Sequence, residues 1–254
     1  MEETTKNLLI EMVSSFETDE IREFAKLCIK NAPKYWFHVP ASSTGKYHPK
    51  FSLGDGGLLR HEVAVLRLLN HMLMVESIAS DFTSRERDLL RVAAIAHDMW
   101  KSGTQEDYEK SKWTKFDHPL IAADHVRNMV GLPSEDLEFI AHAVESHMGQ
   151  WNTDKKHPDI ELPKPSDKYQ KILHLADYLA SRKDINIDFD GIEIPEPEPE
   201  PLPDINTWIV KFGKYKDEGL TIPQLAEKYP GYFRWAQKNV TIEPAKTMLQ
   251  SYEV

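Results

Sequence analysis

Apolar residues recur at spacings of three and four along most of residues 7–181. This spacing places apolar side chains on one face of an α-helix, where they can face a core. It predicts helices over residues 7–15, 21–29, 58–78, 86–97, 118–130, 135–147 and 168–181. No alternating apolar and polar run is long enough to predict a sheet, and no internal repeat occurs. The pattern therefore predicts an all-α fold.

Capping residues support two of these boundaries. Asp117 precedes His118 and Pro119, which is the order of an N-cap followed by a proline in the first helical turn. Residues 133–135, with the sequence Pro-Ser-Glu, open the next helix in a similar way. Gly131 lies between the two helices and favours a helix end there.

Proline alternates with glutamate at residues 194–203. Because proline has no backbone N–H to donate, this stretch predicts an extended, solvated linker. We therefore expect a helical domain over residues 1–190, an acidic proline-rich linker over 191–205 and a small module over 206–254. At about fifty residues, the module is near the lower size limit for an independent fold.

The composition is that of an ordinary globular protein, with 254 residues of which 41% are hydrophobic and 28% charged. No apolar run approaches the roughly 20 residues of a membrane helix, and the N-terminus lacks the order of a signal peptide. We therefore expect a cytoplasmic protein with no membrane partner. The single cysteine, Cys28, excludes an internal disulfide and a cysteine-based zinc site, and its apolar neighbours predict a buried position.

The net charge of −10 argues at first against a nucleic-acid partner, because phosphates are bound chiefly by lysine and arginine. Seven of the acidic residues, however, lie between residues 188 and 204, where no basic residue occurs. Residues 1–187 carry only −5. The excess of negative charge belongs mostly to the linker and does not exclude a nucleic-acid substrate.

The dipeptide His97-Asp98 lies at the end of the apolar run over residues 86–97. Adjacent imidazole and carboxylate side chains suit a hard or borderline divalent metal ion. Two residues cannot hold a catalytic ion alone, but further candidate ligands lie in other segments of the chain: His61, His118, His142, His147 and Asp177. Together these residues predict a metal site.

The order of these ligands resembles that of the HD superfamily of metal-dependent phosphohydrolases. Other segments are similar to the HD-type 3'-to-5' exoribonucleases of bacteria, namely Pro40-Ala41-Ser42, Tyr47-His48, Gly56 to His61, Ser146 to Gly149 and His174 to Ser181. The resemblance covers roughly residues 35–183 and implies an HD-type helical bundle. One departure is that those relatives often carry two adjacent histidines where this chain has His147-Met148.

The resemblance implies a metal-ligand set, which consists of His61, His97, Asp98, His118, His142, His147 and Asp177. Helical geometry leaves two of these residues open, because His142 and His147 differ by about 140° around a helix axis. Either the helix ends between them and both bind, or only one does. If two ions bind, Asp98 is expected to bridge them. We expect manganese, with magnesium, nickel, cobalt or iron as alternatives, and one or two ions.

The expected chemistry is hydrolysis, since a divalent ion lowers the pKa of bound water and polarises a phosphoryl oxygen. We expect Asp98 and Lys101 to be catalytic, with Lys101 neutralising a phosphate oxygen in the transition state. Lys101, Arg60 and Arg182 are also expected to bind the substrate. His174, one turn from Asp177, is expected to be structural.

The C-terminal module contains Phe212-Gly213-Lys214-Tyr215-Lys216 and a Tyr-x-x-Trp end, and it resembles a module appended to some bacterial exonucleases. Interleaved aromatic and basic side chains suit single-stranded nucleic acid, because rings stack on bases and cations contact phosphates. Alternatively, several of these rings form the core of the module, together with other apolar side chains: Trp208, Phe212, Leu225 and Trp235.

The first interpretation is therefore a metal-dependent phosphohydrolase of the single-strand nuclease or phosphodiesterase class, because both resemblances lead toward exonucleases. A nucleotidase or cyclic-nucleotide phosphodiesterase would use the same site on a smaller substrate. Some di-iron oxygenases share this ligand order, so iron-dependent oxygen chemistry is a second alternative. A non-catalytic metal-binding interaction protein is the third.

Overall fold

The computed structural model describes residues 2–42, 48–191, 194, 202–242 and 244–252. The chain folds into two compact units, Met1–Pro197 and Glu198–Val254. The boundary between the units falls within the expected linker, most of which lies outside the described residues, as does Tyr47.

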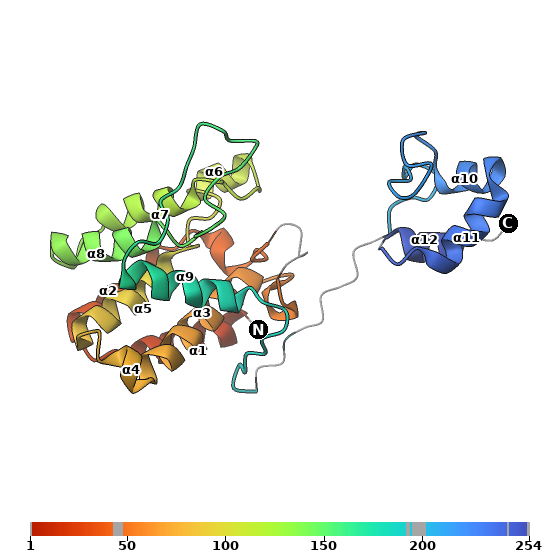
Figure 1. Ribbon diagram of the computed structural model, residues 1–254. Coiled ribbons are helices and arrows are strands. Elements are labelled where there is room, and N and C mark those ends of the chain that lie inside the picture. Colours follow the sequence, from red (N-terminus) through yellow and green to blue (C-terminus); the bar gives the residue numbers. More distant parts are fainter. Residues whose placement is uncertain (1, 43–47, 192–193, 195–201, 243, 253–254) are drawn as a thin grey trace. The chain divides into compact units, whose positions relative to one another are not determined.

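The first unit is all-α, as the hydrophobic pattern predicts (Figure 1). Its helices are α1 (Glu2–Ser14), α2 (Asp19–Asn31), α3 (Gly57–Met74), α4 (Glu76–Ala79), α5 (Ser84–Ala96), α6 (Gln105–Lys110), α7 (His118–Arg127), α8 (Ser134–Val144) and α9 (Lys168–Ala180). Short 3-10 helices occur at Lys34–Phe37 and Lys50–Ser52. The only β-type pairings in the described part of the chain are isolated bridges, such as Thr153 with Glu161.

Some boundaries differ from the predicted ones. The helix expected over residues 58–78 ends at Met74, and the separate short helix α4 follows. α6 was not predicted, because six residues are too few to show a helical period; Thr104 and Asp107 form a capping box at its start. Asp117 precedes α7, but its side chain makes no capping hydrogen bond.

α3 forms the centre of the first unit, where it packs against α5 and α9 (Figure 1). Every residue from Gly57 to Leu66 is buried, so this helix begins inside the protein. A side chain on Gly57 would place its Cβ atom 2.3 Å from the carbonyl oxygen of Ser52. Glycine at position 57 therefore lets the preceding loop lie against the start of α3.

The core of the first unit joins apolar side chains from all its longer helices. Cys28 is buried in this core, as predicted, and burial raises the pKa of its thiol to about 12. No helix among the described residues is both long and apolar enough to cross a membrane.

The second unit contains α10 (Ile222–Lys228), α11 (Pro230–Asn239) and α12 (Ala245–Ser251). It has a core of its own, formed by Val210, Ile222, Leu225, Ala226, Phe233, Ala236, Met248 and Leu249. Trp208 and Phe212 pack against this core, whereas Trp235 is 52% exposed. Of the four residues considered as core at the sequence level, Trp235 is thus the one that the core does not cover.

Candidate metal centre

The ends of several helices deliver the candidate ligands to one buried region. His97 and Asp98 follow the last residue of α5, His118 is the first residue of α7, and His147 follows α8. His61 and Asp177 lie within α3 and α9, which pack against each other. Helix ends can aim neighbouring residues at a common point, which explains how both His97 and Asp98 reach this region.

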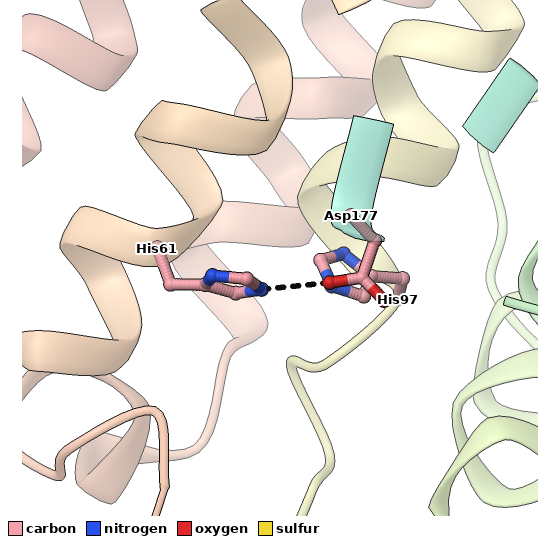
Figure 2. A group of neighbouring side chains, drawn as sticks. All are labelled: His61, His97 and Asp177. Atoms are coloured by element: carbon pink, nitrogen blue, oxygen red, sulfur yellow. Dashed lines mark hydrogen bonds and ion pairs between the residues drawn. The ribbon is translucent and has the colours of Figure 1, made fainter. Parts of the chain in front are cut away.

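The first ligand group consists of His61, His97 and Asp177, whose donor atoms lie within 4.8 Å of one another (Figure 2). The Oδ1 atom of Asp177 lies 3.0 Å from His61 Nε2 and 3.7 Å from His97 Nε2. Two imidazoles and a carboxylate from three different helical segments thus face one point.

The second group consists of His97, Asp98 and His147, again with donor atoms within 4.8 Å. His118 adjoins this group, because its Nε2 atom lies 2.9 Å from Asp98 Oδ1 and 3.2 Å from His147 Nε2. His97 is common to the two groups, and Asp98 belongs to the second.

Hydrogen bonds to the backbone orient three of the imidazoles. The Nδ1–H groups of His97, His118 and His147 donate to the carbonyl oxygens of Ala94, Lys115 and Val144, at 2.8, 2.7 and 2.8 Å. In a neutral ring this leaves the lone pair on Nε2, which is the arrangement that metal-binding histidines use.

The donor atoms at the centre fit a cation. Two of them are buried without a hydrogen-bond partner: His97 Nε2 and Asp98 Oδ1. Leaving buried polar atoms unpaired costs free energy, roughly 1–3 kcal/mol each, so such atoms need an explanation. A divalent ion held by imidazole nitrogens and carboxylate oxygens would supply one for His97 Nε2 and Asp98 Oδ1.

The comparisons with known proteins agree with this geometry. The family model for the HD domain matches residues 68–182, a stretch that begins after His61 and includes the other candidate ligands. The chain contains an HD domain. It is also 25% identical over 189 residues to the 3'-5' exoribonuclease YhaM of Bacillus licheniformis, which covers 70% of this chain. The chain spans about half of that relative's length (54%), and no solved structure matches it.

The carboxylates make the HD domain's centre strongly attractive to positive charge. Burial alone would lower the pKa of His97, but the carboxylates of Glu62 and Asp98 outweigh burial and raise this pKa well above its usual value. Burial would raise the pKa of Asp98, yet attraction to Lys101 and His97 holds it well below its usual value. A metal ion at His97 Nε2 would displace the proton that these carboxylates stabilise.

The pKa values of Asp177 and His147 are also shifted. Burial would raise the pKa of Asp177, but the hydrogen bond from His61 and attraction to His97 lower it well below its usual range. Burial lowers the pKa of His147 to about 4, so its imidazole is neutral at physiological pH. Both side chains are therefore in the protonation state that binds a metal.

Glu62 was missed by the sequence reasoning. Its carboxylate is completely buried, with Oε2 lying 3.0 Å from His97 Nδ1 and Oε1 accepting a hydrogen bond of 3.5 Å from Trp36 Nε1. Burial raises the pKa of Glu62, and the charge of His97 partly offsets this. A glutamate next to a candidate ligand, in a predicted helix made mostly of apolar residues, was the signal that could have identified it.

Lys101 lies next to Asp98. Its ammonium group pairs with Asp98 Oδ2, one helical turn away, and its side chain is only 15% exposed. The positive charge therefore stands at the edge of the second ligand group.

His142, by contrast, is brought into neither ligand group. It lies within α8, is 43% exposed, and its Nε2 atom lies 2.8 Å from Asp167 Oδ2. His147, five residues later, lies beyond the end of the helix. The helix thus ends between the two histidines, but only His147 reaches the centre.

Arg60 and Arg182 lie in different surroundings from those expected of substrate-binding residues. The buried guanidinium of Arg60 donates to the carbonyl oxygens of Phe51, Leu53 and Asp55, at 2.6, 2.7 and 2.9 Å. It thereby holds the loop before α3, which is a structural role. Arg182 is exposed and donates to Asp184 at 3.2 Å.

His48 lies beside the centre. Its ring centroid is 5.8 Å from that of His61, and burial, followed by repulsion from His61, lowers its pKa to about 4. Its Nδ1 atom is buried without a hydrogen-bond partner. This histidine is therefore a neutral neighbour of the first ligand group.

Proposed function

We propose that this protein is a metal-dependent phosphohydrolase that cleaves phosphodiester bonds in single-stranded nucleic acid. The observation that carries the proposal is the convergence of four imidazoles and two carboxylates in one buried centre of an HD domain. The substrate class is supported by the similarity to a protein named as a 3'-5' exoribonuclease.

Six residues would hold the ion or ions, and these are His61, His97, Asp98, His118, His147 and Asp177. A bound divalent ion supplies hydroxide at neutral pH and polarises a phosphoryl oxygen. Manganese is our first choice, since this mixture of imidazole and carboxylate ligands suits it.

Other groups of the chain orient the imidazole rings and supply a positive charge beside them. The backbone carbonyls behind His97, His118 and His147 fix the tautomers, so that no ring has to reorient when a ligand binds. Lys101 neutralises Asp98 in the absence of substrate, and it can turn toward a phosphate oxygen on which charge develops.

We assign catalysis to residues 1–190, followed by a linker over 191–205 and a separate module over 206–254. The assignment rests on the position of the ligands, all of which lie in the first unit, and on the separate core of the second unit. No residue of the second unit is required to complete the proposed metal site.

The test is hydrolysis by the full-length protein after metal removal and reloading. Labelled single-stranded RNA, single-stranded DNA, cyclic dinucleotides and nucleoside monophosphates would be incubated with Mn²⁺ or with EDTA. We expect single strands to be degraded only with metal, and Asp98→Asn to lower the rate about a thousandfold or more, since it removes a ligand charge without changing the side-chain size.

Asp159→Asn is the matched control, because Asp159 is an exposed aspartate outside both ligand groups. It should keep the wild-type rate. The proposal fails if no substrate is hydrolysed with any divalent ion, or if Asp98→Asn keeps the wild-type rate. Oxygen consumption that depends on iron would instead favour an oxygenase.

A further inference from the structure

A cavity of about 390 Å³ lies beside the metal centre, on the side of α9. It is lined by Gly149, Gln150, Lys164, Pro165, Lys171 and His174. Two of these residues are lysines and one is a histidine, whereas none is acidic. The lining therefore favours an anionic ligand.

One hydrogen bond joins this cavity to the metal centre. The Nδ1–H group of His174 donates to the carbonyl oxygen of the ligand His147, at 2.7 Å. Gly149 permits this contact, because a Cβ atom at that position would lie 2.1 Å from His174 Cε1. The turn that begins at the proposed ligand His147 therefore also contributes Gly149 to the wall of the cavity.

An aromatic surface adjoins the cavity. Trp151 is 50% exposed, and its ring stacks on Tyr178 with the centroids 5.9 Å apart and the planes 23° apart. The Trp151 and His174 rings have their centroids 6.5 Å apart, so the tryptophan borders the cavity wall. A tryptophan held by a second ring but half open to solvent is a suitable platform for a planar ligand.

Basic side chains flank the aromatic surface. Lys171, Tyr178 and Arg182 are separated by seven and four residues, which places them on one side of α9 and its C-terminal end. The Arg182 guanidinium lies 5.7 Å from the centroid of the Tyr178 ring. Within the described residues, neither Lys164 nor Lys171 forms an ion pair with a carboxylate.

A planar aromatic platform bordered by unpaired lysines matches the chemistry of a nucleotide. Base–aromatic stacking tolerates any base, and lysines contact the backbone phosphate. The two rings lie close to proposed ligands in the sequence. Trp151 follows His147 by four residues, and Tyr178 directly follows Asp177. A single strand held at this surface therefore lies against segments that also carry the proposed metal ligands.

We propose that Trp151, Tyr178 and His174, with Lys164 and Lys171, form a subsite for one nucleotide of a single-stranded nucleic acid, next to the nucleotide at the metal centre. The base stacks on Trp151, and the lysines contact the phosphate. The subsite rests on the proposed function, which it extends by separating recognition of the strand from cleavage.

The first experiment measures binding without cleavage. A fluorescein-labelled single strand of about ten nucleotides is titrated with the full-length protein in EDTA, and its anisotropy gives Kd. Trp151→Ala should raise Kd about tenfold, the loss expected for one stacked base, while Trp151→Phe should keep it within about threefold. Trp113→Ala, which removes an exposed tryptophan (69%) of the first unit outside the subsite, is the matched control and should change Kd less than Trp151→Ala does.

A second experiment tests the lysines. The plot of log Kd against log salt concentration should become less steep by about 1.4 in the double variant Lys164→Ala, Lys171→Ala, because each lost phosphate contact contributes about 0.7 for a single strand. Circular dichroism melting of every variant shows that the fold is kept. An unchanged salt dependence would remove the lysines from the subsite.

Hydrolysis of bis(p-nitrophenyl) phosphate by the wild type with Mn²⁺ tests the proposed function by itself, since this small diester reports on the chemistry of the metal centre and not on binding of a strand. If the wild type hydrolyses neither diester nor single strand, the proposed function fails, while the Kd comparison still decides the subsite. The subsite is refuted if the wild type does not bind the single strand, or if Trp151→Ala binds it as tightly as the wild type.

Discussion

Substitution of Glu62 by glutamine tests how the buried carboxylate behind His97 supports the metal centre. The carboxylate lies against two N–H groups. Its Oε2 atom is 3.0 Å from His97 Nδ1, whose proton is also directed at the carbonyl oxygen of Ala94, and its Oε1 atom accepts a hydrogen bond of 3.5 Å from Trp36 Nε1. A glutamine of the same size has one acceptor oxygen, so it can face only one of them. If that oxygen faces His97, its NH₂ group faces the Trp36 donor.

Two effects of known size follow from this substitution. Loss of a partner behind a metal-binding histidine typically weakens metal affinity 10–100-fold, or about 1.4–2.7 kcal/mol. A buried donor facing another donor costs about 1–3 kcal/mol of folding stability. Loss of the negative charge also lowers the pKa of His97, because Glu62 is the first of the groups that raise it. A lower pKa of His97 means that a proton competes less with the metal ion for Nε2. This gain offsets only part of the lost metal affinity, since a negative charge attracts a divalent cation about twice as strongly as it attracts a proton.

The assay is titration of metal-free protein with Mn²⁺, by calorimetry or against a chelating dye, at fixed pH. Urea unfolding in EDTA gives the stability separately. Glu11→Gln, which changes an exposed glutamate of α1, is the control and should leave both quantities unchanged. A Glu62→Gln variant that folds and binds Mn²⁺ as tightly as the wild type would refute the argument that this carboxylate raises the pKa of His97 and supports metal binding there.

Three further predictions concern other residues near the centre. Elemental analysis should show less bound metal in His147→Ala but wild-type content in His142→Ala, because only His147 reaches the ligand groups; equal losses would contradict this. Arg60→Lys should cost about 2–4 kcal/mol in urea unfolding, since an ammonium cannot reproduce the fork that meets three carbonyl oxygens; an unchanged midpoint would show that the loop is held otherwise. In the metal-free folded protein the pKa of His48 is about 4, whereas in the unfolded chain it has its ordinary value of about 6.5. As pH falls, the unfolded chain therefore takes up the proton first. The free energy of unfolding should decrease between about pH 6.5 and 4, by up to about 3 kcal/mol. His48→Gln should remove this part of the acid sensitivity, whereas His71→Gln, which changes an exposed histidine, should not.

The sequence by itself determined the fold class and the candidate ligands of the proposed metal centre. A period of 3.6 residues is a local property, so helices over the apolar runs could be predicted without knowing what covers them. His97-Asp98 at the end of such a run indicated a metal, and the order of His61, His118, His147 and Asp177 resembled that of a known family. The HD domain match confirms that family.

Only the tertiary structure decided which of the candidate residues lie at the centre. Spacing along a helix allowed His142 and His147 equally, but α8 ends at Val144, so that His147 turns inward and His142 faces Asp167. Likewise, Arg60 was a candidate for phosphate binding until the loop before α3 supplied three carbonyl oxygens to its guanidinium.

Glu62 illustrates the same limit. A charged residue in a mostly apolar helix is visible in the sequence, but its contact with His97 is visible only in the structure. A sequence lists which groups can donate, accept or carry charge. The distances between groups from different segments determine which of them interact, because electrostatic and hydrogen-bond energies depend on separation in space. Those separations are set by the packing of α3 against α5 and α9, which no single segment contains.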